Sequence, residues 1–112
     1  MEAQPREVAI YQTEDERKPF QEWLEDLKDK KGVAAIDAKI AKVRKGNLGD
    51  CSSVGEGVSE FRVDCGPGYR VYFGRVGKTE VILLNGGDKS TQDADIKQAQ
   101  AYWKDYKERN KT

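Results

Sequence analysis

The sequence predicts an α+β fold in one domain, with a strand, two helices, three strands and a final helix in that order. Three observations lead to this expectation. Apolar residues recur at helical spacing between residues 19 and 45, alternate with polar residues from Val58 onward, and return to helical spacing after Ser90. The chain has 112 residues, of which 37% are hydrophobic, so it can bury one modest core. We therefore expect residues 1–112 to form a single domain.

A short strand and a helix open the chain. Val8 to Tyr11 form an apolar run that is typical of a strand. The next apolar stripe predicts a helix, and it consists of Phe20, Trp23, Leu24 and Leu27. Thr13 and Glu16 match a capping box, but a helix beginning there would place Pro19 in its interior. We therefore predict a separate turn followed by a helix that begins at Pro19.

A second helix and a loop follow. The second helical stripe consists of Val33, Ile36, Ile40 and Val43. Gly46 and Asn47 are typical of the left-handed residues that close a helix, so residues 19–45 should form a helical hairpin. Residues 46–57 carry four glycines without helical or strand periodicity, which predicts a mobile loop.

The second half of the chain predicts a meander and a helix. From Val58 the apolar period is two, and turns at 66–68 and 76–78 separate three strands. Ser90 or Thr91 can cap a last helix. Its buried face would contain Ile96, Ala99, Trp103 and Tyr106. Residues 108–112 should form a polar tail. We expect the helices to cover one face of a small, mostly antiparallel sheet and to leave the other face free.

Composition points to a cytoplasmic protein that does not cross a membrane. Met1 to Arg6 lack the apolar region of a signal peptide, and no run approaches the roughly 20 apolar residues that span a bilayer. Cys51 and Cys65 are too few for a disulfide scaffold, so we expect two free thiols.

Charge is balanced overall but unevenly distributed. Twenty basic residues match twenty acidic ones, which gives no general attraction to nucleic acid. Residues 14–29 hold seven acids and three bases, whereas residues 30–45 hold six bases and one acid. This pattern favours opposite charges that pair across the helical hairpin, and it leaves a local basic face as the alternative.

Several chemistries lack the residues that they need. The chain has no histidine, and two cysteines separated by 13 residues are a poor metal set. Gly86 and Gly87 before Asp88 have the wrong spacing for a phosphate-binding loop. We expect no metal or other cofactor and no nucleotide hydrolysis.

Polar side chains should gather on one side of the meander. Alternation places Glu60, Arg62 and Asp64 on one side of their strand, and Arg70 and Tyr72 on one side of the next. These sets should be cross-strand neighbours. They are either a functional surface or cross-strand ion pairs, from Glu60 to Arg62 or Arg70, on an exposed sheet.

Lys89 is a further candidate because it lies just before a predicted helix N-terminus. The free N–H groups and the dipole at such a terminus favour an anion such as phosphate. The alternative is that Lys89 is simply solvated.

Two segments resemble a known family. GEGVSEFRVDCGPGYRVYFGR, at 55–75, and LLNGGDKSTQDADIKQA, at 83–99, are similar to the signature blocks of HigB-like addiction-module killer proteins in the RelE/ParE superfamily. Upstream, FQEWLEDLKDKKG and KVRKGNLGD resemble the family's helical hairpin and the loop after it, so the resemblance extends over residues 7–106. It implies a RelE/ParE-like fold with the order β-α-α-β-β-β-α.

The resemblance implies the toxin of a type II toxin-antitoxin system. Such toxins are similar to metal-independent endoribonucleases (mRNA interferases) that cut messenger RNA in the ribosome and inhibit growth. A ribose 2′-hydroxyl attacks its own phosphate, which requires alignment, charge neutralisation and proton transfer. Arg70 and Lys89 match the family's motifs and are assigned to catalysis at the phosphate. Arg62, Gln92 and Tyr72 are further candidates for RNA binding. The implied partners are the ribosome, mRNA and a cognate antitoxin, expected to be a helix-turn-helix DNA-binding protein.

The sequence departs from the superfamily pattern near the last helix. Some superfamily nucleases place a tyrosine or histidine there, where this chain has Asp93 and Asp95. Asp88 and Tyr72 remain alternatives for proton transfer. Two other functions also remain open: a ParE-like poison of DNA gyrase that cleaves nothing itself, and a degenerate member that only binds its antitoxin.

Overall fold

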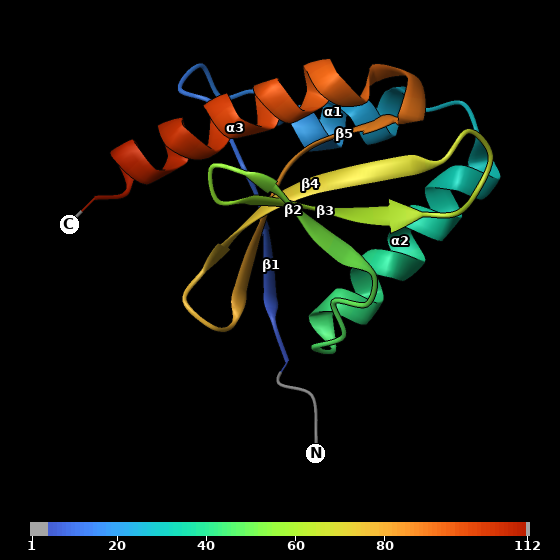
Figure 1. Ribbon diagram of the computed structural model, residues 1–112, viewed down its shortest axis with the longest axis horizontal. Coiled ribbons are helices and arrows are strands. Elements are labelled where there is room, and N and C mark those ends of the chain that lie inside the picture. The colour runs from blue at the N-terminus through green and yellow to red at the C-terminus, as the bar shows by residue number, and fades with distance from the viewer. Residues whose placement is uncertain (1–4, 112) are drawn as a thin grey trace.

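A mixed five-stranded sheet with helices on both faces forms the protein (Figure 1). The computed structural model describes residues 5–111. The elements in chain order are β1 (Glu7–Ile10), α1 (Pro19–Asp26), α2 (Lys30–Arg44), β2 (Cys51–Gly55), β3 (Val58–Val63), β4 (Tyr69–Val76), β5 (Glu80–Asp88), the 3-10 turn η1 (Lys89–Thr91) and α3 (Gln92–Arg109). The strand order is β1-β5-β4-β3-β2. Only the β1–β5 pair is parallel, which confirms an α+β fold with a mostly antiparallel sheet.

The helical hairpin forms as predicted. Pro19 is the first residue of α1, and a separate turn at Thr13 precedes it. The Asp29 carboxylate caps α2 by accepting a 3.0 Å hydrogen bond from the Gly32 N–H. At the other end, Gly46 has φ 98° and donates to the Val43 carbonyl, while the Asn47 N–H donates to that of Lys42. These two bonds are the Schellman closure expected of a Gly-Asn pair.

The charges of the two hairpin segments do not pair as predicted. The four ion pairs in the described part of the chain do not join the acidic segment 14–29 to the basic segment 30–45. Arg17 instead pairs with Glu22 inside the acidic segment, at 2.5 Å. Most charges of the two arms remain exposed to solvent, where the free energy of pairing is small.

The predicted mobile loop at 46–57 is partly wrong, because residues 51–55 form the edge strand β2. It pairs antiparallel with β3, with Cys51 opposite Phe61 and Ser53 opposite Ser59. The two-residue turn between them has positive φ at Glu56 (55°) and at Gly57 (81°). This conformation matches the twist of a tight hairpin. The meander therefore has four strands rather than three.

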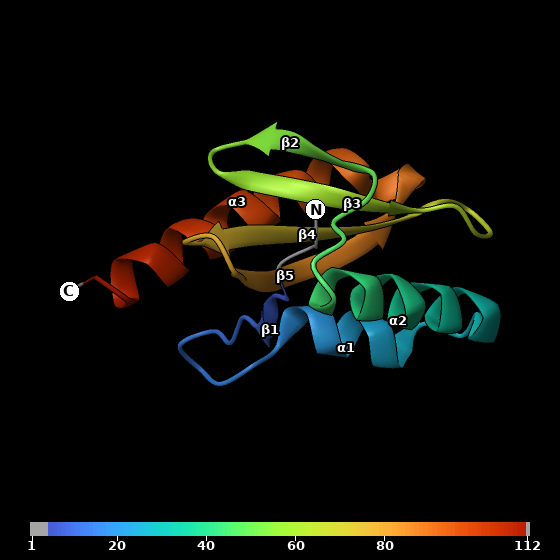
Figure 2. The ribbon, with the colours of Figure 1, turned by 90° about the horizontal axis from the view of Figure 1, so that it is seen from below.

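Helices cover both faces of the sheet, so the expectation of a free face is wrong. On one face, α1 and α2 pack Phe20, Ile36 and Ile40 against Phe61 and Leu83. On the other face, α3 packs Ala99 and Trp103 over a second core of Tyr11, Val58, Tyr72, Ile82 and Leu84. Figure 2 shows the hairpin and α3 on opposite sides of the strands. Each face of the sheet therefore has its own core.

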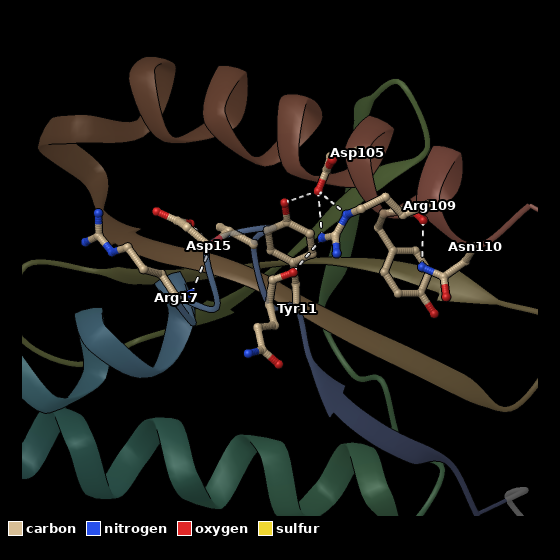
Figure 3. Close-up of polar contacts among 9 residues, drawn as sticks. Tyr11, Asp15, Arg17, Asp105, Arg109 and Asn110 are labelled. Carbon is tan, nitrogen blue, oxygen red and sulfur yellow. Dashed lines mark hydrogen bonds and ion pairs between the residues drawn. The ribbon is translucent and has the colours of Figure 1, made fainter.

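The last helix is longer than predicted. It continues to Arg109, so the first residues of the predicted polar tail are helical, and Thr112 lies outside the described residues. Figure 3 shows Tyr11, Asp105 and Arg109 pointing toward one another near the end of α3. The Asp105 carboxylate accepts from Tyr11 at 2.5 Å and from Arg109 Nη2 at 2.7 Å, and Arg109 also donates to the Gln12 carbonyl at 2.6 Å. These bonds fasten the C-terminal part of α3 to the residues after β1.

Candidate functional site

The predicted polar residues of β3 and β4 are neighbours on the α3 face. Arg62 lies directly opposite Arg70, and Arg70 lies opposite Gly87 of β5. Lys89 follows two residues after Gly87, at the start of η1. The sequence-based expectation that Arg62 and Arg70 meet across the hairpin is confirmed.

Glu60 joins the two arginines, which confirms the expected ion pairs of Glu60 with Arg62 and Arg70, although Glu60 is buried rather than on an exposed sheet and was not among the predicted site residues. Its Oε1 accepts a hydrogen bond from Arg70 Nη1 at 2.9 Å and another from Arg62 Nε at 3.3 Å. Glu60 is 2% exposed, whereas the side chains of Arg70 and Arg62 are 13% and 49% exposed. The buried carboxylate therefore fixes one edge of Arg70 and leaves Arg62 largely at the surface.

The area around Glu60 contains an unusual number of buried polar atoms without a hydrogen-bond partner among residues 5–111. They are Glu60 Oε2, Arg70 Nε, the Tyr72 hydroxyl and Asn85 Oδ1. Tyr72 is the direct cross-strand neighbour of both Glu60 and Asn85, so these atoms belong to one patch. Each such atom destabilises a fold by about 1–3 kcal/mol, and natural proteins keep few of them. A concentration of them in one place is typical of a site that binds a polar ligand or water. We call Glu60, Arg70, Tyr72 and Asn85 the polar cluster.

Tyr72 lies at the bottom of this cluster, beneath α3. It is fully buried, and burial, with the carboxylates of Glu60 and Asp95 nearby, raises its pKa from 10.0 to about 12. Its side chain is thus neutral near pH 7. The predicted RNA contact does not fit this position, because no part of Tyr72 is exposed at the surface.

The N-terminal end of α3 covers the cluster at β5. Asn85 Nδ2 donates a 3.1 Å hydrogen bond to the Asp95 carbonyl in the first turn of the helix. A Cβ atom at Gly87 would overlap the Asp95 carboxylate, so a larger residue there would require the Asp95 side chain to move. Burial raises the pKa of that carboxyl group, and a hydrogen bond from Thr91 opposes the shift. The close contact of β5 with α3 thus defines one wall of the cluster.

The cap of the last helix differs from the prediction. Thr91 is the N-cap residue of α3, but its side chain makes no capping bond. The Asp88 carboxylate caps η1 instead, by accepting from the Ser90 N–H at 2.8 Å. Hydrogen bonds from Ser90 lower the pKa of Asp88, which is therefore ionised at neutral pH. An aspartate just before the helix is a good cap because its oxygen reaches the free N–H groups of the first turn.

Lys89 and Gln92 are the first residues of η1 and α3, and they lie at the surface. Lys89 is exposed and Gln92 half-buried, and both line a shallow depression with Ser90, Thr91, Asp93 and Ala94. The carboxylates of Asp88 and Asp93 flank the same turn, so its electrostatic character is mixed. A phosphate bound here would meet Lys89 and the helix dipole on one side and two acids on the other.

The fold and the site define a class of protein, a small α+β domain with a buried polar cluster under its last helix. No family model matches the chain. It is 52% identical, over 80 residues, to an uncharacterized protein of Haemophilus influenzae strain Rd. The alignment covers 71% of this chain and 81% of that relative. The chain therefore belongs to the same family as this H. influenzae protein. None of the helices within residues 5–111 is both long and apolar enough to cross a membrane.

Proposed function

We propose that this protein is the toxin of a type II toxin-antitoxin pair with a RelE/ParE-like fold, and that it cleaves messenger RNA on the ribosome without a metal. One observation carries the proposal beyond the resemblance. Arg62 of β3 and Arg70 of β4 lie directly opposite each other and are joined by the buried carboxylate of Glu60. They lie near the end of β5, where Lys89 begins the turn η1 that leads into α3. This arrangement could align and neutralise a phosphodiester.

The chemistry needs only groups that this chain has. The ribose 2′-oxygen forms a bond to the adjacent phosphorus, the bond from phosphorus to the 5′-oxygen breaks, and a proton passes from the 2′-hydroxyl to the leaving oxygen. Arg70 and Lys89 would stabilise the charge that develops on the phosphoryl oxygens. The exposed Arg62 and the half-buried Gln92 would position the RNA.

Glu60 would act on this reaction through Arg70. By accepting from Nη1 it restricts the guanidinium to one orientation, while Nε is left without a partner among the described residues. A donor that is already oriented loses less entropy when it binds a phosphate. Two groups were considered for proton transfer. Asp88 is ionised and partly exposed beside Lys89, whereas Tyr72 is neutral and fully buried. Only Asp88 can therefore be reached by RNA, which favours it.

A role in binding alone is the second candidate, and the burial of Arg70 favours it. An arginine that is 13% exposed and paired with a buried glutamate has the environment of a structural ion pair. The formal net charge of zero is also unusual for a ribosome-binding nuclease. Such a member would bind its antitoxin without cutting RNA.

Brief expression in a bacterium with mapping of RNA 5′ ends separates these functions. A nuclease should give cuts in translated messages in phase with codons, and a helix-turn-helix antitoxin expressed with it should suppress both the cuts and the growth defect. DNA breaks with intact transcripts would instead indicate a gyrase poison. Normal growth with intact RNA and DNA would leave only the binding role.

A further inference from the structure

The outer edge of β1 has open hydrogen-bonding groups. The Glu7 N–H donates to the Thr79 carbonyl at 2.8 Å, and the Tyr11 N–H donates to the Leu83 carbonyl at 2.9 Å. In a parallel ladder, alternate residues direct both backbone groups to the same side. Val8 and Ile10 therefore direct their N–H and C=O groups away from β5, toward the edge of the sheet.

An apolar groove runs along this edge. It lies between β1 and the helical hairpin, and its apolar lining consists of Val8, Ile10, Phe20, Leu24, Ile40 and Leu83. Ile10 is one of two large hydrophobic residues that are strongly exposed in residues 5–111, at 38%. Val8 and Ile10 thus contribute their backbone to the open edge and their side chains to the groove.

The two edges of the sheet differ in how they resist pairing with another chain. Natural edge strands resist it by being short, or by carrying bulges, prolines or charges. The opposite edge, β2, has a register irregularity between Ser53 and Gly55 and ends in a glycine. β1 is short and begins with the charged Glu7, but Val8 to Ile10, which include both residues with outward backbone groups, have no charge, glycine or proline. The β1 edge is therefore the one suited to an added strand.

The rim of the groove indicates the chemistry of the occupant. Glu25 and Asp37 supply two carboxylates, and Arg44 supplies one positive charge at the end near Arg6, whose N–H donates to the Arg44 carbonyl. The two carboxylates outnumber the arginine, so the rim attracts an incoming segment that carries a lysine or arginine.

We propose that the β1 edge and this groove bind an extended segment of another protein. The segment adds a sixth strand beside β1, inserts alternate aliphatic side chains into the groove, and places a basic residue near Glu25 and Asp37. The groove is on the hairpin face, whereas the polar cluster is on the α3 face. The inference therefore does not depend on RNA cleavage.

A synthetic peptide tests the proposal. In Lys-Thr-Val-Thr-Ile-Thr-Lys, the aliphatic residues and both lysines share one face of a strand. In NMR titrations of the full chain, it should slow amide exchange at Val8 and Ile10 and shift the signals of Leu24 and Ile40. The signals of Arg70 should not move. Absence of these changes at millimolar peptide would overturn the proposal.

Two kinds of variant test the binding mode. Ile10→Pro removes an outward N–H but leaves the hydrogen bonds to β5, so it should weaken binding by about tenfold or more. Ile10→Val keeps the N–H and should bind within a few-fold of the wild type. Glu25→Lys with Asp37→Lys changes two exposed side chains and should also weaken binding, which keeps the test valid if the proline variant does not fold. Equal binding by Ile10→Pro and Ile10→Val would contradict strand addition. A dimer that Ile10→Pro converts to monomers would assign the edge to a second copy instead.

Discussion

Glu60 reaches diagonally across the β3–β4 ladder to accept a 2.9 Å hydrogen bond from Arg70, while the hydroxyl of its direct cross-strand neighbour, Tyr72, has no hydrogen-bond partner within residues 5–111. Removing one partner of such a buried pair leaves an uncompensated charge. Arg70→Ala should therefore lower the free energy of unfolding by about 3–5 kcal/mol.

The double variant Glu60→Gln/Arg70→Gln should lose less stability than the sum of the losses of Glu60→Gln and Arg70→Gln, with a coupling energy of about 1–3 kcal/mol. Urea unfolding of Arg70→Ala measures the first loss, and urea unfolding of the wild type, Glu60→Gln, Arg70→Gln and the double variant measures the coupling. Strictly additive losses in these last variants would show that the pair is not coupled.

The proposed nuclease function predicts an ordered loss of toxicity. Arg70→Ala should reduce cleavage by about 10²- to 10³-fold, as removal of a phosphate or oxyanion contact commonly does, and Lys89→Ala should reduce it less. Arg75→Ala is the matched control, because Arg75 is an exposed arginine of the same strand outside the polar cluster. Growth curves and RNA 5′-end mapping give the readout. If a folded Arg70→Ala protein is fully toxic, then Arg70 is not the phosphate contact.

The antitoxin interaction can be tested across a salt series. If the antitoxin covers Arg62, Arg70 and Lys89 with acidic groups, its affinity should fall steeply with salt and should be weaker for Arg70→Ala. If it binds elsewhere and blocks access to the ribosome, Arg70→Ala should bind as tightly as the wild type. Calorimetry with both toxins distinguishes the two routes, and absence of binding by either would remove the antitoxin claim.

The unpaired hydroxyl of Tyr72 predicts an unusual response to mutation. Tyr72→Phe removes a buried polar atom that has no partner in the part of the chain that the structure describes, so stability should be unchanged or rise by about 1 kcal/mol. Tyr11→Phe is the comparison, because it removes a hydrogen bond to Asp105 and should destabilise by about 1 kcal/mol. Thermal unfolding of the two variants checks the contrast. A large loss for Tyr72→Phe would show that the hydroxyl is bonded in solution.

The same tyrosines predict instability in alkali. The pKa of Tyr72, and that of Tyr11 through burial and its bond to Asp105, is raised from 10.0 to about 12 in the folded protein. Above pH 10 the unfolded chain loses these protons while the folded chain keeps them. This contribution to stability is therefore fully present below pH 10 and is lost as the pH rises toward 12. Denaturation curves between these pH values should show the decline, and it should be shallower for Tyr72→Phe.

Local sequence signals were sufficient for the hairpin but not for β2 or the placement of α3. Pro19 and the Gly46-Asn47 pair have local conformational effects that can be recognised without knowing the fold. In contrast, β2 is a polar edge strand, and its turn at Glu56-Gly57 lacks the Asn-Gly or Asp-Gly pair that usually marks such a hairpin. An apolar helical stripe also predicts that a helix packs, without specifying which face of a sheet it covers.

The candidate site was predictable to a similar degree. Alternation along β3 and β4 was enough to bring Arg62 and Arg70 together. It did not identify Glu60 as the buried centre, because a charged residue in an alternating strand usually faces solvent. The available signal was Val58, an apolar residue on the same side of β3, which indicated that part of this face is covered.

The parallel pairing of β1 with β5 has a consequence for synthesis on the ribosome. Residue 7 pairs with residue 80, so β1 emerges early and has no partner in the sheet until most of the chain has been made. Contacts between such distant residues form slowly because a long loop must close first. The nascent protein should therefore complete its sheet only near the end of translation.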